Sequence, residues 1–268
     1  MKIESQTPYI EKIKGSEISA VFALLKKEIL RFGKVWVQTI LAPVISSLLF
    51  LMIFSYLLNG RLEPLPEISY SSFLVPGLVM MTLQQNAFSN TSSSLTQSKI
   101  SGNLIFLMLS PMRPWQWFIG YLGGSIVRGL ACGIVLWLFC LFIVQTPVKF
   151  PLLALWFAVM SCILMGSLGI IAGIYAEKYD QISAFQNFLI NPLTLLAGVF
   201  FSTSNLPDLW RTLSLFNPFF YLIDGFRFGI FGVSDVSPWI SLLVCNISAV
   251  SVSLICIYLI ATGWKLKN

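Results

Sequence analysis

The chain has 268 residues, of which 56% are hydrophobic and only 10% are charged. Soluble domains carry about 25% charged residues, so the composition excludes an ordinary water-soluble fold and predicts an integral membrane protein. The chain has no histidine, and its five cysteines fall inside long apolar stretches. We interpret these cysteines as small buried hydrophobic residues, and we expect no disulfide framework and no metal site.

The N-terminal region is polar at first and then amphipathic. Residues 1–16 are expected to form a flexible cytoplasmic N-terminus. Residues 17–33 repeat apolar side chains at helical spacing and carry Lys26, Lys27 and Arg31 elsewhere on the wheel. This pattern predicts an amphipathic helix on the cytoplasmic membrane surface. The alternative is an extension of the first membrane span, which the cations make costly.

Long windows with few or no charges predict six membrane-spanning helices, because a helix needs roughly 20 apolar residues to cross the hydrocarbon. Most Lys and Arg residues then lie on the side of the two termini, which is therefore the cytoplasm. Residues 17–264 are thus predicted to form one all-α transmembrane domain, with a cytoplasmic tail at 265–268. In chain order, the predicted spans are residues 35–59, 70–94, 115–144, 150–175, 184–204 and 237–262.

The second predicted span is apolar in its first half and polar in its second, QQNAFSNTSSS. Polar groups at membrane depth must face protein or water. Gln84, Gln85 and Asn86 are therefore expected to face a bundle interior or an aqueous cavity. The alternative is that they only form interhelical hydrogen bonds and have no role in transport.

Arg128 lies about 13 residues into the third predicted span, or ~20 Å along a helix. A cation at this depth is costly and is expected to have a partner or a wet cavity. Its role is either functional, or structural through snorkelling or tertiary pairing. The glycines around it predict a thin helix face for close packing, and they are Gly120, Gly123, Gly124, Gly129 and Gly133.

The longest cytoplasmic connection is predicted at residues 95–114. Its centre, NLIFLML, is apolar but too short to cross a membrane. We expect a short helix that lies on the membrane face or docks into another protein. A second cytoplasmic turn carries Glu177, Lys178 and Asp180, which we interpret as a solvated loop without the partners for a metal site.

The segment FNPFFYLIDGFRFGIFG, residues 216–232, is rich in aromatic residues but is interrupted by Pro218 and by glycines. Irregular backbone is tolerated at membrane depth only when it is buried in protein or lines water. The segment is therefore predicted to form re-entrant helical pieces on the outer side, between spans five and six. Asp224 and Arg227 are three residues apart, so they are expected to share a helix face and neutralise each other.

Several motifs, taken in order, resemble those of the ABC type-2 transport permeases, the membrane subunits of bacterial exporters, and most closely the YadH-like inner-membrane permeases. The resemblance runs from about residue 20 across almost the whole chain. Its motifs are SFLVPGLVMM, GYLGGSIVRG, YAEKYDQIS and NPFFYLIDGFRFG. In the last motif, Pro218, Tyr221 and Arg227 stand at the family's spacing after Leu206 and Pro207.

The resemblance implies a six-span half-transporter in the bacterial inner membrane, which dimerises with itself or with a second permease. It also implies two copies of a separate ATP-binding subunit on the cytoplasmic face. ATP and magnesium would bind that subunit, since the chain has no phosphate-binding G-x-x-x-x-G-K-[ST] loop. We therefore expect no catalytic residue and no cofactor on this chain. The amphipathic helix 17–33 and a coupling helix at about 99–111 would touch the ATPase.

Individual residues acquire expected roles from the same resemblance. The segment between spans five and six would be an outer gate. Relatives often carry acidic residues where this chain has Ile105 and Phe106, so an apolar contact with the ATPase is expected there instead. The expected coupling residues are Lys99, Gly102, Asn103, Leu107, Pro111, Arg113 and Asp180; the outer signature is Pro207, Asn217, Pro218, Tyr221, Asp224 and Arg227; and the candidates for the pathway or dimer interface are Gln84, Gln85, Asn86 and Arg128.

Two other classes of function are considered. An ion-gradient-driven secondary transporter would use intramembrane ionisable groups or inverted repeats, and Arg128 is its one candidate. A membrane-embedded lipid-group transferase would need clustered carboxylates or histidines, which the predicted spans do not offer. The transported substrate stays open between a lipid-linked glycan, a drug-like amphipath and a peptide.

Overall fold

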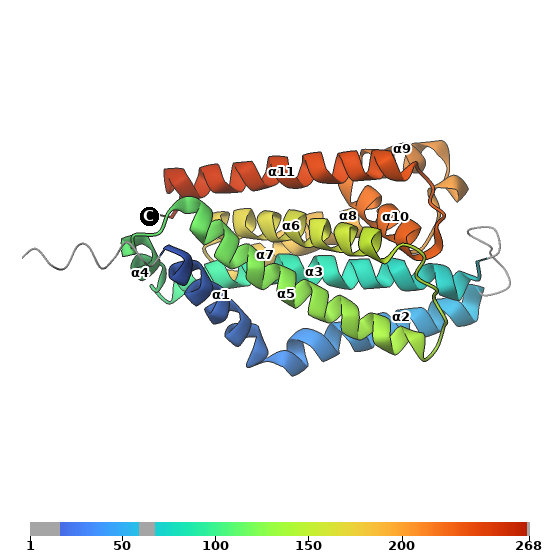
Figure 1. The fold of residues 1–268 in the computed structure, drawn as a ribbon, viewed down its shortest axis with the longest axis horizontal. Coiled ribbons are helices and arrows are strands. Elements are labelled where there is room, and N and C mark those ends of the chain that lie inside the picture. The colour runs from blue at the N-terminus through green and yellow to red at the C-terminus, as the bar shows by residue number, and fades with distance from the viewer. Residues whose placement is uncertain (1–16, 59–67, 267–268) are drawn as a thin grey trace, which may run out of the picture.

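The computed structural model describes residues 17–58 and 68–266. The predicted flexible segment 1–16, the last residue of the first predicted span and the end of the predicted tail (267–268) lie outside the described residues. The chain forms an elongated bundle of helices (Figure 1). The beginning of α1, the short helix α4 and the C-terminal end of α11 lie at one end of the bundle, and α9 lies at the other.

The amphipathic helix forms as α1, Glu17–Gly33. A turn follows at residues 34–35, and the chain then bends into the π-helical segment η2, Val37–Leu41, and the helix α2, Ala42–Leu58 (Figure 1). The alternative prediction, that residues 17–33 extend the first membrane span, is therefore wrong. One face of α1 buries Leu24, Glu28 and Phe32, four residues apart, whereas Ile18 stays 72% exposed.

The helix at the centre of the bundle is α3, Tyr70–Ile100, whose side chains are mostly buried. It packs most extensively on α6, Pro151–Tyr175, and on α5, Pro114–Leu141. Glycines allow the close approach to α6: a Cβ atom at Gly169 would lie 2.2 Å from Thr91 Oγ1 and 2.5 Å from the carbonyl oxygen of Phe88. Thr91 Oγ1 also donates to the Gly166 carbonyl at 2.8 Å. Small residues thus bring the two backbones together.

The predicted glycine face of α5 is confirmed. A Cβ atom at Gly120 would meet Leu24 of α1, and one at Gly124 would lie 2.5 Å from Glu28 Cβ. Farther along α5, a Cβ atom at Gly129 would lie 2.8 Å from Cys162 Sγ of α6. The face therefore seats α1 on the bundle and packs α5 on its neighbours.

The predicted fifth span, 184–204, differs from the structure. The region divides into α7, Tyr179–Phe185, the π-helical segment η3, Gln186–Ile190, and α8, Asn191–Leu195. Turns and bends follow, with Gly198 in the left-handed region at φ 78°. The helical run thus begins earlier than predicted and ends before Gly198, because this glycine turns the chain out of helical geometry.

The last third of the chain contains α9, Asp208–Phe216, α10, Pro218–Phe231, and α11, Pro238–Thr262. A short 3-10 turn, η4, Thr203–Asn205, precedes α9. Helix α10 packs against α6, α11 and α3 and is largely buried, whereas α9 exposes most of its side chains. The predicted coupling helix, 99–111, is shorter in the structure: Lys99 belongs to α3, and α4 covers only Leu104–Leu109.

Among the described residues, four helices are long and apolar enough to cross a membrane: η2 with α2 (Val37–Leu58), α5, α6 and α11. Helix α3 has 31 residues, but its polar second half lowers its hydropathy. The fold is therefore that of an all-helical, multi-pass membrane protein. Proline at the first helical position begins α5, α6 and α11, where its missing N–H has no intrahelical acceptor to lose.

Candidate functional site

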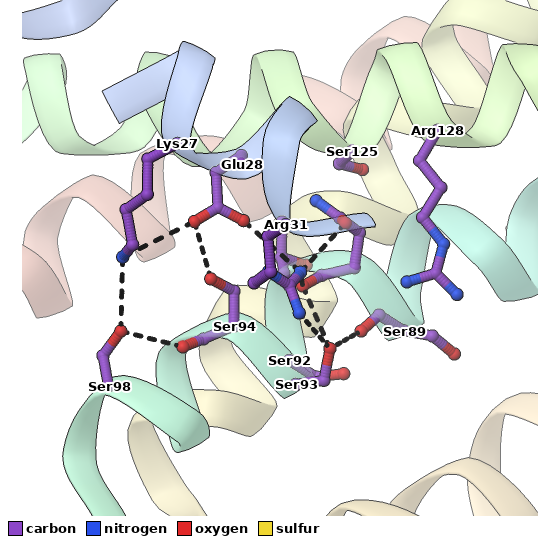
Figure 2. A network of polar contacts seen from close by, with 12 residues as sticks. Lys27, Glu28, Arg31, Ser89, Ser92, Ser93, Ser94, Ser98, Ser125 and Arg128 are labelled. Carbon is purple, nitrogen blue, oxygen red and sulfur yellow. Dashed lines mark hydrogen bonds and ion pairs between the residues drawn. The ribbon is translucent and has the colours of Figure 1, made fainter. Parts of the chain in front are cut away.

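A polar network joins α1 to the polar half of α3 (Figure 2). At its centre, the Glu28 side chain is fully buried and accepts a hydrogen bond of 2.6 Å from Ser94 Oγ. Glu28 also forms ion pairs with Lys27 at 3.7 Å and with Arg31 at 3.4 Å. Arg31 Nη2 donates to the backbone carbonyl of Asn90 at 2.7 Å and to Asn90 Oδ1 at 3.0 Å. The amphipathic helix is thus fixed to the bundle by buried charge as well as by apolar contacts.

A second set of contacts lies one turn closer to the N-terminus of α3, at Asn86 and Gln85. Arg128 of α5 donates to Asn86 Oδ1 from Nε at 3.3 Å and from Nη2 at 3.1 Å. Gln85 Nε2 donates to Asn191 Oδ1 of α8 at 3.3 Å. The expected pathway residues therefore make interhelical hydrogen bonds, and Arg128 has found a polar partner. Gln84, by contrast, is fully buried, and neither polar atom of its side chain has a hydrogen-bond partner among the described residues.

Only one face of α3 keeps access to the surface in its polar half. Between residues 82 and 97, the side chains that are not fully buried are those of Gln85, Ser89, Ser93 and Gln97, four residues apart and all polar. We call these four residues the polar stripe. Ser89 Oγ donates to Gln186 Oε1 of η3 at 3.4 Å, so η3 borders the stripe.

The predicted coupling residues lie in or beside α3, α4, α5 and α7, and α4 lies at one end of the bundle (Figure 1). Lys99 Nζ donates to the backbone carbonyls of Ile174 and, at 3.3 Å, of Ala176, so it caps the C-terminal end of α6. Gly102 adopts φ 71°, the left-handed conformation that ends many helices.

Helix α4 presents apolar side chains to the exterior. Ile105, Phe106 and Leu109 are 60%, 73% and 77% exposed, whereas Leu104 is buried in the bundle. Leu107 is half-buried and packs against the same group of buried hydrophobic side chains as Leu104. The remaining expected coupling residues lie at ends or beginnings of helices: Asn103 before α4, Pro111 after it, Arg113 before α5 and Asp180 in the first turn of α7, all exposed.

The outer signature residues mainly hold helices in place. Asn217 precedes α10, and its Oδ1 accepts from the Phe219 amide at 3.0 Å while its Nδ2 donates to the Leu193 carbonyl at 2.6 Å. Tyr221 Oη donates to the Leu215 carbonyl at 2.8 Å. Pro218 is the first residue of α10, and Pro207 precedes α9. Asn217 and Tyr221 thus tie the beginning of α10 to α8 and to the end of α9.

Asp224 and Arg227 both lie on α10, three residues apart, but they make no direct ion pair within 4.0 Å. Both ion pairs within 4.0 Å among the described residues are formed by Glu28. Asp224 is fully buried and accepts from the backbone amides of Asp235 at 2.9 Å and Val236 at 3.2 Å. Arg227 donates to the Gly198 carbonyl at 2.8 Å and lies over the ring of Phe73 at 3.9 Å. Each charge therefore fixes a different connection.

Glu28 and Asp235 were missed by sequence reasoning. Glu28 stands among three cations, a pattern that is typical of a solvated helix face. Asp235 accepts hydrogen bonds from Ser202 Oγ at 2.6 Å and from the Thr203 amide at 2.7 Å, which closes the connection before α9. One signal for Glu28 was available: it is the single acid within the cationic segment after residue 17.

The Glu28 network leads to a prediction for Ser94→Ala. The substitution removes a hydrogen bond to a buried carboxylate, which is expected to cost about 1.5–3 kcal/mol. Faster hydrogen exchange of the α1 amides would measure the loosened docking of α1. Ser46→Ala is the matched control, because the exposed Ser46 hydroxyl bonds only within α2, to the Ala42 carbonyl. Equal exchange in both variants would show that the network does not hold α1.

The described residues form an all-helical, multi-pass membrane bundle whose central helix, α3, carries the polar stripe. The chain belongs to the ABC-2 type transporter family, whose model matches residues 19–231.

The relatives of this chain include transport permeases. The chain is 36% identical to the inner membrane transport permease YadH of Escherichia coli K12 over 249 residues, which cover 93% of this chain and 97% of that protein. The YadH protein of Shigella flexneri matches equally. A more distant relative, the probable multidrug ABC transporter permease YbhR of E. coli K12, is 23% identical over 160 residues, or 59% of this chain and 44% of that protein. The resemblance seen in the sequence motifs is therefore confirmed.

Proposed function

We propose that this chain is the membrane-spanning permease subunit of an ATP-driven exporter, that it works as a homodimer in the bacterial inner membrane, and that two copies of a separate ATP-binding subunit supply the energy. Membership of the ABC-2 family supports the class. The observation that carries the coupling is the exposed apolar face of α4, formed by Ile105, Phe106 and Leu109. Exposed apolar patches of this kind mark interaction sites.

The proposed topology has six crossings with both termini in the cytoplasm. The crossings are η2 with α2, α3, α5, α6, the run α7–η3–α8, and α11. This arrangement is supported by Figure 1, in which α4, the beginning of α1 and the end of α11 lie at the same end of the bundle. Helices α9 and α10 would then be the re-entrant outer elements, with α10 buried in protein as polar backbone at membrane depth requires.

In the proposed mechanism, ATP binding brings the partner ATPases together, and they press on α4 and α1. Two contacts can transmit the displacement into the bundle. Lys99 joins the end of α3 to the end of α6, and Glu28 joins α1 to Ser94 of α3. The polar stripe would line the pathway between the two copies, because it is the polar face of α3 that keeps access to the surface.

The test is co-purification. This chain is expressed with the ATP-binding subunit encoded beside it, captured by a tag on this chain, and assayed for ATP hydrolysis. A stable 2:2 complex with turnover is the expected result. A folded, monodisperse chain that captures no ATPase would contradict the proposal and favour a gradient-driven carrier.

Coupling through α4 predicts the behaviour of Leu107→Pro. Proline in a helix interior costs about 3 kcal/mol and breaks the helix, so transport should fall to background while the chain still inserts and binds its ATPase. Leu107→Ala is the control, since it keeps the helix and leaves the exposed face of α4 intact. Normal transport by Leu107→Pro would rule out α4 as the coupling element.

The topology predicts which introduced cysteines react with a membrane-impermeant thiol reagent. The five native cysteines are buried, so they give a low background. In intact cells, Asp208→Cys at the beginning of α9 should be labelled, and Asp180→Cys in α7 should react only after the membrane is opened. Both positions are exposed, which makes them a matched pair. The reverse pattern would invert the proposed topology.

A further inference from the structure

A groove of about 940 Å³ opens between α1, η2, α3 and α5, beside the network of Figure 2. Four cations line it: Lys27, Arg31, Lys34 and Arg128. The hydroxyl groups of Ser93 and Ser98 lie among them, and no Asp or Glu is part of the lining. The groove therefore offers hydrogen-bond donors and positive charge on the same surface.

The positive charge of the groove is not balanced by the described residues. Glu28, which lies behind the lining, pairs with Lys27 and Arg31. Neither Lys34 nor Arg128 has a carboxylate within 4.0 Å in the described part of the chain, and the hydrogen bonds of Arg128 go to the neutral side chain of Asn86. Arg128 is half-buried, and a cation partly removed from bulk water without a counter-charge is unfavourable. The groove is therefore suited to an anion.

The general preference of cytoplasmic loops for cations does not account for the groove. That preference acts on loops and helix ends, which describes Lys34. Arg128 is the fifteenth residue of α5, about 21 Å along the helix from Pro114. Figure 2 shows Arg128 directed from α5 toward α3, and Arg31 directed from α1 toward the same helix. Cations from two separate helices thus converge on one place.

The rim of the groove is apolar. Leu30 and Val35 belong to its lining and are 54% and 48% exposed, and the next residue, Trp36, is 54% exposed. A ligand in this groove would meet cations and hydroxyls on the inside and aliphatic side chains at the edge. That combination matches an amphipath, whose head group is anionic and whose tail is apolar.

We propose that the groove binds the phosphate group of an anionic lipid from the cytoplasmic leaflet. Guanidinium groups bind phosphate through paired, charge-assisted hydrogen bonds, and Arg128 and Lys34 are the cations without a carboxylate partner. The lipid chains lie against Leu30 and Val35. The inference rests on the proposed function only for the orientation that puts the groove in the cytoplasmic leaflet.

The test titrates the purified full-length chain in detergent with dioleoyl phosphatidic acid and counts bound lipids by native mass spectrometry. Dioleoyl phosphatidylcholine has the same chains and a phosphate but no net charge, and inorganic phosphate has the charge without the chains. Phosphatidic acid is expected to bind about tenfold more tightly than phosphatidylcholine. Equal binding of the two lipids, or displacement of phosphatidic acid by inorganic phosphate at the same concentration, would overturn the inference.

Variants locate the site. Arg128→Gln and Lys34→Gln are each expected to weaken phosphatidic acid binding by about tenfold. Arg211→Gln, at an exposed position on α9, is the control and should bind like the wild type. Lys34 is exposed, so its variant keeps the test decisive if Arg128→Gln fails to fold. Wild-type selectivity in Lys34→Gln and in any folded Arg128→Gln would overturn the assignment.

The binding assay needs no ATP-binding subunit, so the two proposals fail separately. A chain that selects phosphatidic acid but captures no ATPase contradicts the proposed function and leaves the lipid site standing. A complex that hydrolyses ATP but shows no preference for the anionic lipid contradicts the lipid site alone.

Discussion

Arg227→Ala is expected to lower the free energy of unfolding by about 3 kcal/mol, because it combines the loss of a buried charged hydrogen bond with a cavity. Arg227 is 1% exposed, donates to the Gly198 carbonyl, and stacks on Phe73 of α3. Truncation leaves that carbonyl without its donor at the place where the chain turns after α8. The loss would appear as a lower melting temperature of the purified protein and as reduced transport.

Arg211→Ala is the matched control for this prediction. Arg211 lies in the neighbouring helix α9 and is exposed, and substitutions at such positions usually change stability by less than about 0.5 kcal/mol. Equal melting temperatures for the two alanine variants would show that Arg227 does not stabilise the fold more than an exposed arginine does. Both arginines are predicted to lie on the outer half of the protein, so a difference between them reports burial rather than side of the membrane.

Gly169→Val is expected to destabilise the bundle by about 3 kcal/mol or to prevent a monodisperse preparation. Position 169 faces α3 where the two helices are closest, and a side chain there must displace the Phe88 backbone carbonyl as well as Thr91. The Phe88 backbone cannot move aside as a flexible side chain could, so little room is left for relaxation. Size-exclusion profiles and melting temperatures in detergent would measure the effect.

The comparison for Gly169→Val is Gly33→Val. Gly33 ends α1, and a Cβ atom there would meet nothing within 4 Å. This variant should retain the elution profile of the wild type. If Gly169→Val had the same elution profile and melting temperature as Gly33→Val and the wild type, the contact between α3 and α6 would be looser than in the structure.

Most helix boundaries could be predicted from the sequence. The apolar windows 150–175 and 237–262 match α6 and α11 to within a residue, because membrane-spanning helices must be apolar and proline marks their first turn. The range 184–204 was less accurate, since apolar composition does not reveal a π-helical segment or a left-handed glycine. The coupling helix was too long in the prediction because Gly102 was not treated as the end of α3.

The candidate site was predicted in its residue types more than in its contacts. The polar half of α3 and the cation at position 128 were visible, but the pairing of Arg128 with Asn86 depends on how α5 packs. Glu28 was missed because burial of an acid is a tertiary property: its side chain is enclosed only when Gly124 and Ser94 come from two other helices. The direct contacts of Asp224 and Arg227 depend on tertiary structure in the same way, since Asp224 accepts from the backbone amides of Asp235 and Val236 and Arg227 donates to the Gly198 carbonyl.

Each of the two π-helical segments borders one polar feature of the protein: η2 borders the groove, and η3 borders the polar stripe. Gln38 and Thr39 of η2 line the groove, and Gln186 of η3 accepts from Ser89 of the stripe. Each segment stands just before a proline, Pro43 or Pro192. A π turn contains one residue more than an α turn, so a wide turn that migrates along its helix rotates the part it passes by about 100°. Each π turn therefore sets how the helix that follows it, α2 or α8, is rotated relative to the residues that border the groove or the stripe.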